Sequence, residues 1–356
     1  MLGTFLYFQP SLQSKAFGKF PLADSRDSFI FRRITVKRKE AFLLENFIFS
    51  VNATLPVFLV IVVGYVLKQI GLVDSHFTNV LNRFNFHVSL PVMLFRDIMN
   101  SDIRKTFDLK YILFCVFATT VCFWALWGLS KKFIRQKESV GAFVQASFRG
   151  SAAVLGAAFI QNMYGTSGMA PLMIIGCVPL YNIYSVIVLS AESNGKKEKS
   201  LKNTALEIAK NPIIIGILAG LLVSASGIRL PVILDKTVSS IASTATPMAL
   251  IVIGAAFEGK KAVSKIKLTG IASVIKLLIQ PAIFLPLAVL AGFRDQHLIA
   301  LLVMLGAPTT VSCYIMAKNM ENDEYLTSSV IVVTTLFSSV IMTFWIYLLK
   351  SFSFIS

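Results

Sequence analysis

The feature that most constrains this chain is a succession of apolar runs that begins near Glu45 and continues almost to its end. The runs are roughly 18 to 25 residues long, enough for a helix to cross about 30 Å of hydrocarbon. Hydrophobic residues make up 55% of the chain and charged residues 15%, which is more apolar surface than a soluble domain can bury. The sequence therefore predicts an all-α polytopic membrane protein. About ten transmembrane helices are expected, at residues 46–68, 77–96, 110–130, 139–163, 168–191, 209–226, 233–257, 266–292, 296–318 and 325–349.

Lys and Arg are concentrated in the links between the apolar runs, so the net charge of +16 indicates a topology and not nucleic-acid binding. The odd-numbered links hold fifteen of these cations and the even-numbered links hold seven. By the positive-inside rule, the odd links lie in the cytoplasm and both termini lie outside the cell. We expect a multi-pass protein of the plasma or inner cell membrane, with the lipid bilayer as a partner and no nucleic acid.

Residues 1–44 differ in composition from the rest of the chain. They hold eight Lys and Arg residues against three acids, and no apolar stretch long enough for a signal sequence. Eight cations on the outer side would oppose the topology derived from the links. We expect a disordered or flexible leader, or a start codon placed too far upstream with Leu43 or Leu44 at the natural start.

An internal repeat with a constant offset of 156 residues relates two halves of the apolar region. Five helices per half is an odd number, so the second half must enter the membrane in the opposite orientation, as in an inverted repeat. The predicted organisation is a first five-helix repeat at 45–192, a cytoplasmic linker at 193–208, a second repeat at 209–350 and a tail at 351–356. The pairs that carry the offset are Pro56 and Pro212, Gly64 and Gly220, Gly71 and Gly227, Pro91 and Pro247, Leu94 and Leu250, and Gly150 and Gly306.

The fourth and ninth helices are the expected place of a solute site. In inverted-repeat carriers, discontinuous helices near the bilayer midplane expose main-chain groups and helix ends to the solute. Pro308 removes an N–H group from the ninth helix and should open it at mid-depth. A kink without function is the alternative interpretation of the same residue.

Short motifs occur in both halves: Leu55-Pro56 with Gly64-Tyr65, Leu90-Pro91-Val92-Met93-Leu94-Phe95, Phe148-Arg149-Gly150, Asn211-Pro212, Pro247-Met248-Ala249-Leu250 with Gly254, Lys276 with Pro281, and Ala307-Pro308 followed by Ala317. Together they resemble the auxin efflux carrier family of membrane transporters, in particular its bacterial malate-permease-like members. The resemblance covers about Phe47 to Leu349. It implies ten helices in two inverted five-helix repeats, with helices 4 and 9 broken and crossing at the centre. It also implies a small organic anion as substrate, a carboxylate such as malate or an auxin-like acid.

Two cations, Arg149 and Lys276, lie well inside the predicted spans. Each needs a partner, water or a ligand, because an unpaired charge in hydrocarbon costs several kcal/mol. The planar fork of Arg149 suits a substrate carboxylate, and the alternative is that it binds carbonyl groups freed near Pro308. Lys276 could instead extend its charge toward the headgroups. The candidate substrate-binding residues are Arg149, Gly150, Ser151, Gly306, Pro308, Thr309, Thr310, Ser312 and Lys276.

The predicted spans hold no Asp or Glu at mid-depth, and the nearest acids, among them Asp97, lie at helix ends. This argues against a core proton relay of the sodium/proton antiporter type. The sequence contains no nucleophile–base pair, metal-ligand group or nucleotide motif, so we expect no enzyme, no metal and no cofactor.

The leading functional interpretation is secondary transport of a small organic anion by alternating access at the crossing of helices 4 and 9. The alternatives are a sodium-coupled bile-acid-type or amino-acid carrier of the same fold class, and a non-transporting membrane receptor. Small residues at Gly141, Ala142 and Ala146 could pack within the chain or in a homodimer.

Overall fold

A computed structural model of the chain describes residues 55–100, 108–152, 169–193, 209–228, 230–257 and 264–355, with a few isolated residues outside these ranges. Secondary structure in these ranges is helical, apart from one isolated pairing of extended residues. The all-helical prediction is therefore confirmed for the described part of the chain. Residues 1–43 and the link 194–208 lie outside it, and so do the expectations for a leader and a linker.

Helices of the first half occupy the positions that the apolar runs predict. Ser75–Met99 is continuous helix, although a π-helical turn interrupts its α-helical hydrogen bonding. Further along, α5 is short and ends in the middle of the predicted fourth helix. The elements are the helix Leu55–Gln69, α2 (Ser75–Phe84), the π turn η1 (Asn85–Ser89), α3 (Leu90–Met99), α4 (Leu109–Phe133), α5 (Val140–Phe148) and α7 (Ala170–Ala191).

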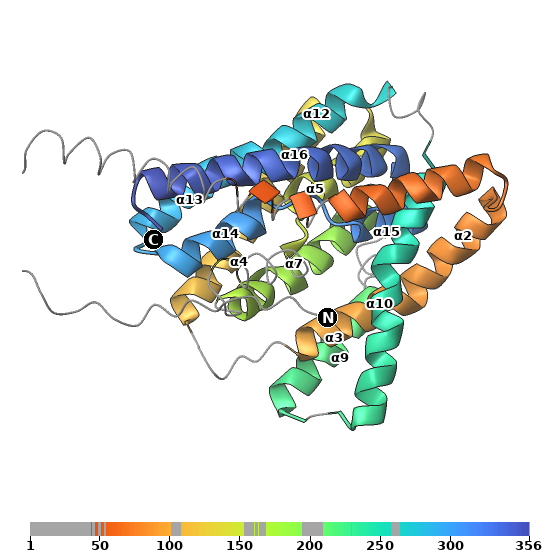
Figure 1. Cartoon of the computed structure of the whole chain (residues 1–356), viewed down its shortest axis with the longest axis horizontal. Coiled ribbons are helices and arrows are strands. Elements are labelled where there is room, and N and C mark those ends of the chain that lie inside the picture. Colours follow the sequence, from red (N-terminus) through yellow and green to blue (C-terminus); the bar gives the residue numbers. More distant parts are fainter. Residues whose placement is uncertain are drawn as a thin grey trace, which may run out of the picture. The chain divides into compact units, whose positions relative to one another are not determined.

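The second half follows the same order of elements. Its fourth helix is interrupted as well, because five residues separate α14 from α15. Figure 1 shows α16, in blue, running alongside α12 and α14, which it contacts. The elements are α9 (Pro212–Ser226), α10 (Val232–Ala255), α12 (Ile266–Val274), the π turn η4 (Ile275–Ile279), α13 (Gln280–Leu290), α14 (Asp295–Gly306), α15 (Ser312–Asn319) and α16 (Glu324–Ser351).

Length and composition allow several of the described helices to cross a membrane. Five are long and apolar enough to do so: α4, α7, α10, the continuous helix Ile266–Leu290, and α16. Three further apolar helices, Leu55–Gln69, α9 and α14, are shorter. Exposed apolar side chains such as Leu222 and Leu290 are 72% and 83% accessible, as expected for helices that face lipid.

Helix ends are set by local sequence signals. The side chains of Asp74, Asp108 and Asp323 each accept a hydrogen bond from the main-chain N–H three residues later, at 2.7 to 3.0 Å. Each therefore satisfies a donor that the first turn of α2, α4 or α16 leaves free. Gly71 and Gly227, with φ of +76° and +70°, follow the first helix of each half in the left-handed conformation that glycine favours.

Two close helix contacts occur at corresponding positions of the two halves. Gly64 lies so close to the main chain of Ile251 that an added Cβ would overlap its carbonyl oxygen. Gly220 makes the corresponding contact with Phe95, and an added Cβ would lie 2.8 Å from the Phe95 carbonyl oxygen. Gly220 stands 156 residues after Gly64, and Ile251 stands 156 residues after Phe95. The first helix of each half therefore packs closely on the second helix of the other.

Helix contacts sort the described elements into two groups. α2, α3, α9 and α10 pack on one another, whereas α4, α5, α7, α12, α13, α14 and α16 make a second set of contacts. α15 contacts members of both groups. Its residues Cys313 and Tyr314 are buried in a cluster with Ile61 and Leu250, so one half of the interrupted helix is packed against the first group.

The small-residue face of α5 is used within the chain. Ala142 and Ala146 are fully buried in a cluster with Ala272 and Leu326, and Gly141 lies against other residues of the same chain. This face is therefore not free for a homodimer contact.

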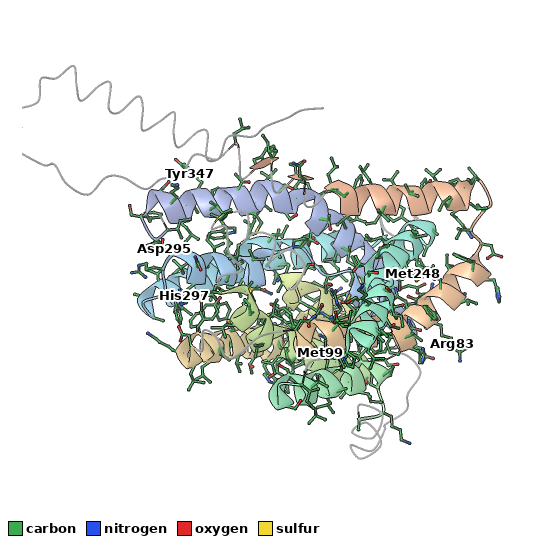
Figure 2. The ribbon with its side chains drawn as sticks, turned by 60° about the horizontal axis from the view of Figure 1, so that its bottom comes forward. Arg83, Met99, Met248, Asp295, His297 and Tyr347 are labelled. Carbon is green, nitrogen blue, oxygen red and sulfur yellow. The ribbon has the colours of Figure 1, made fainter. Side chains whose placement is uncertain are left out.

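The start of α14 is anchored far from its interrupted end. His297 Nε2 lies 3.4 Å from an oxygen of Asp108 at the start of α4, and the N–H of Asp295 donates to the carbonyl of Phe354 at 3.1 Å. Figure 2 shows Asp295 and His297 at the same end of the molecule as Tyr347 of α16. Helix α14 runs from this end to the interruption, where the candidate site lies.

Candidate functional site

Two interrupted helices meet through their main chains. α5 ends at Phe148 and α14 ends at Gly306, and in both cases the next residue is extended. The N–H of Ser151 donates to the carbonyl of Pro308 at 2.9 Å, and Gly150 and Thr309 form an isolated antiparallel bridge. We call residues 149–151 and 307–311 the crossing.

Pro308 leaves one carbonyl of α14 without its helical donor. In a continuous helix the N–H of residue 308 would bond to the carbonyl of Met304, but proline has no N–H. The Tyr181 hydroxyl donates to this carbonyl at 2.9 Å, and Lys276 Nζ donates to it at 3.2 Å. Lys276 Nζ also donates to the carbonyl of Leu305 at 2.8 Å. The opened end of α14 is therefore satisfied by side chains from other helices.

The end of α5 is satisfied in the same way. Thr309 Oγ1 donates to the carbonyl of Ala146 at 2.7 Å, and Gln280 Nε2 donates to the carbonyl of Ser147 at 2.7 Å. The N–H of Thr309 in turn donates to Thr334 Oγ1 at 3.1 Å. Buried carbonyls without donors are costly, so these bonds explain why the chain can hold irregular main chain at this depth.

Arg149 is buried at the crossing among neutral groups. Its Nη2 donates to Asn182 Oδ1 at 2.7 Å and to Ser312 Oγ at 2.8 Å. Its Nη1 donates to Met316 Sδ at 2.9 Å and to Ser185 Oγ at 3.4 Å. The residue is 3% exposed. These four hydrogen-bond partners of the guanidinium are all neutral.

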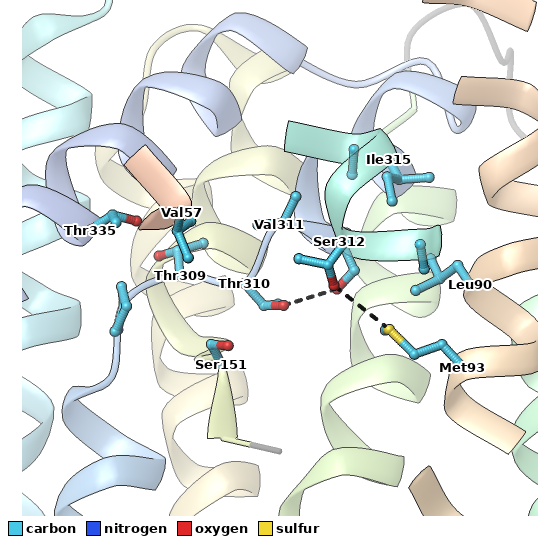
Figure 3. Close-up of a pocket in the computed structure, with 14 residues that line it drawn as sticks. Val57, Leu90, Met93, Ser151, Thr309, Thr310, Val311, Ser312, Ile315 and Thr335 are labelled. Atoms are coloured by element: carbon cyan, nitrogen blue, oxygen red, sulfur yellow. Dashed lines mark hydrogen bonds between the residues drawn. The ribbon is translucent and has the colours of Figure 1, made fainter. Parts of the chain in front are cut away.

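Two adjoining cavities lie beside the crossing. The larger, of about 100 Å³, is lined by both segments of the crossing and by the first helix, α3, α10 and α16; Figure 3 shows its lining residues. The smaller, of about 40 Å³, is lined by Arg149 and Asn182 on one side and by α3 on the other. Ser151, Thr310, Ser312 and Met93 line both cavities. The two cavities thus share walls built from the crossing.

The structure brings most of the predicted site residues together. Arg149, Gly150 and Ser151 line the smaller cavity, and Pro308 and Thr309 line the larger one. Thr310 and Ser312 line both. Gly306 is buried against Pro281. Neither Gly306 nor Lys276 is among the residues that line the two cavities.

The position of Lys276 differs from the interpretation in which its charge extends toward the headgroups. It is fully buried, and its ammonium group binds the carbonyls of Met304 and Leu305, so it does not extend toward the headgroups. The carbonyls freed near Pro308 are therefore bound by Lys276, a role that the sequence left open for Arg149. Arg149 instead binds side chains of α7 and α15.

Asp97 stands at a helix end, as the sequence indicates, and the structure brings it close to Arg149. It lies near the end of α3, yet it lines the smaller cavity together with Arg149. The order of the helices along the chain does not reveal that Asp97 and Arg149 line the same cavity.

Other lining residues were not predicted. Asn182 lies within α7, and its bond to Arg149 depends on the packing of α7 against α5. Val57, Ala249 and Ile315 make the larger cavity partly apolar. Apolar residues in apolar helices give no sequence signal that they line a cavity.

Comparisons with known proteins show the family of the chain. A family model described as membrane transport protein matches residues 49–346. An uncharacterised transporter of Methanocaldococcus jannaschii is 24% identical over 310 residues, which cover 84% of this chain and 98% of that protein. A protein of Rhizobium meliloti named "Putative malonate transporter" is 23% identical over 304 residues, covering 83% of this chain and 95% of its own length. An uncharacterised transporter of Escherichia coli K12 is 22% identical over 309 residues, which cover 84% and 97%.

These relatives are named as transporters, and transporters are not enzymes. The resemblance to auxin-efflux-carrier-type transporters is confirmed. The family model spans most of the chain, including the crossing and both groups of helices. The chain therefore belongs to the membrane transport protein family.

Proposed function

We propose that this protein is a secondary carrier of a small organic anion, with a carboxylate such as malonate or malate as substrate. The observation that carries the proposal is Arg149, a buried guanidinium that lines the smaller cavity and has neutral partners in the described structure. A buried cation of this kind is stabilised by an anion that enters the cavity. A relative's name, "Putative malonate transporter", supports the same class of substrate.

The crossing offers a second source of attraction for an anion. Lys276 is also fully buried and also bonds to neutral groups, the carbonyls of Met304 and Leu305. The positive charges of Arg149 and Lys276 attract an anion to the crossing, and the carboxylate of Asp97 in the smaller cavity opposes part of this attraction. The hydroxyls of Ser151, Thr310 and Ser312 can hydrogen-bond a carboxylate in the cavities.

Transport would proceed by alternating access about the crossing. The two groups of helices are packed on one another through α15 and the walls of the cavities, which suits a rigid movement of one group against the other. An inverted pair of five-helix repeats, 45–192 and 209–350, is supported by the reciprocal contacts of Gly64 with Ile251 and of Gly220 with Phe95. We retain the topology with odd links in the cytoplasm, both termini outside and the protein in the cell membrane.

Asp97 favours a second candidate substrate. Because it lines the same cavity as Arg149, the cavity presents groups of both charge signs. An amino acid carries a carboxylate that suits Arg149 and an ammonium group that suits Asp97. The second candidate is therefore an amino-acid carrier built on the same site.

Uptake into proteoliposomes tests both candidates. Purified protein would be reconstituted, and accumulation of radiolabelled malonate, malate and glutamate compared with that of a neutral sugar. We expect saturable uptake of malonate or malate, which unlabelled malonate or malate inhibits. Uptake of glutamate alone would select the amino-acid candidate, and uptake of neither class would overturn the proposal.

A further inference from the structure

We propose that Lys276 and Gln280 form a clamp that fixes the geometry of the crossing without contacting the substrate. The proposal rests on the transport function proposed above, since it concerns how the substrate site is held. Both residues are buried, and neither lines the two cavities beside the crossing. Their effect on a substrate must therefore pass through the main chain that they hold.

The two side chains bind the ends of both interrupted helices. Lys276 Nζ donates to the carbonyls of Met304 and Leu305 in the last turn of α14. Gln280, one helical turn later, donates from Nε2 to the carbonyl of Ser147 in the last turn of α5. Lys276 Nζ also lies 3.5 Å from Gln280 Oε1, so the two side chains are joined to each other.

The electrostatics of the two helix ends favour a cation at this point. A helix C-terminus carries a partial negative charge, and here two such ends meet in a buried place. An ammonium group satisfies the carbonyls and offsets the helix dipole of α14, whereas an apolar side chain would leave the Leu305 carbonyl without its described donor. Without the clamp, the two ends would keep the main-chain pairing of the crossing and the bonds from Thr309 and Tyr181, and would lose the side-chain link between α14 and α5.

The crossing also fits against the clamp sterically. A Cβ added to Gly150 would lie 2.8 Å from Lys276 Nζ and 3.1 Å from the carbonyl oxygen of Met304. Gly150 is the residue that pairs with Thr309, so the lysine lies directly behind the strand-like pairing. The position of the ammonium group thus defines how closely the two segments approach.

Hydrogen–deuterium exchange of the purified protein tests the clamp without any substrate. In Lys276→Met we expect faster exchange of the Ser151 and Thr309 amides, which bond to Pro308 and Thr334 in the wild-type protein. Lys276→Arg, which keeps the charge and the donors, should restore much of the protection. Lys110→Met is the matched control, because Lys110 also donates to a helix-end carbonyl, that of Ala291, at an exposed position.

Transport kinetics give the second measurement. A clamp that positions the site predicts that Lys276→Met raises KM on the order of tenfold, the effect of losing a charge-assisted bond, with Vmax per folded protein within about twofold. Gln280→Met should weaken the attachment of the α5 end more than that of the α14 end. If Lys276→Met does not fold, Gln280→Met takes its place in both measurements. Wild-type exchange at Ser151 in both variants would overturn the clamp. If the wild-type protein transports no anion, the proposed function fails, while the exchange experiment still decides the clamp.

Discussion

Nη2 of Arg149 lies 2.7 Å from the amide oxygen of Asn182, which binds a buried cation of the crossing to the middle of α7. Asn182 is neutral, so this bond orients the guanidinium and leaves its charge for a ligand. A bidentate bond to a carboxylate needs the planar fork of arginine, and here it would replace at least one of the four neutral partners of Nη1 and Nη2. Substitution of Arg149 therefore tests substrate binding.

Arg149→Lys should weaken malonate binding by about 1.5 to 3 kcal/mol, because lysine keeps the charge and loses the fork. Arg149→Gln should weaken it further. Affinity would be measured by calorimetry, and the melting temperature of each variant without ligand would be recorded in parallel. Arg294→Lys is a matched control, since Arg294 is exposed and donates to the carbonyls of Val289 and Phe293 away from the crossing. Wild-type affinity with a lowered melting temperature would assign Arg149 to structure alone.

Pro308→Ala should reduce transport more than it reduces the amount of folded protein. Alanine restores an N–H that can compete with Tyr181 and Lys276 for the carbonyl of Met304 and so favours a continuous helix. Initial uptake rates, normalised to purified protein, measure the effect. Pro286→Ala, at an exposed position inside α13, should leave uptake unchanged. Equal uptake by the wild type and Pro308→Ala would reduce the interruption to a passive kink.

Gly64→Ala and Gly220→Ala should each destabilise the protein, by about 1 to 3 kcal/mol, because a methyl group would meet the main chain of Ile251 or Phe95. Thermal unfolding in detergent measures this. Gly270→Ala is the control: its Cβ meets nothing within 4 Å, so the better helix propensity of alanine should leave stability unchanged or slightly raised. A stable Gly64→Ala variant would show that the helices can separate without cost.

Labelling with an impermeant thiol reagent tests the orientation in the membrane. Cysteine at Lys137, in the basic third link, should be protected in intact cells, while cysteine at Ile228, in the sixth link, should react. Both positions are exposed, and the four native cysteines are buried, so background labelling should be low. The opposite pattern would reverse the topology.

Much of the fold was predictable because lipid imposes simple rules. Apolar runs of sufficient length give the helices, and Pro308 gives the interruption of α14, since both follow from hydrogen bonding along the chain. Gly71 and Gly227 were found as a pair by their spacing, and both adopt a positive φ.

The partners of the buried polar groups at the site could not be predicted from the sequence. Which carbonyl Lys276 binds depends on the packing of η4 and α13 against α14, which no local pattern encodes. Asp97 enters the smaller cavity for a similar reason, because α3 is packed between α9 and α10. Contacts between distant helices set the partners of buried polar groups, and a single sequence does not reveal them.

The π turn Ile275–Ile279 has a consequence for how this helix could change over generations. A π turn holds one more residue than the α-helical turn that it replaces, so it takes up an extra residue without turning the two flanks of the helix relative to each other. Lys276 lies within this turn and Gln280 follows it directly. Deleting one residue within this turn would therefore restore an ordinary α-helix and leave both flanks on their present faces. The same deletion in the regular α-helical part would rotate one flank by about 100°, so this turn is the place where the helix can lose a residue with the least change in its packing.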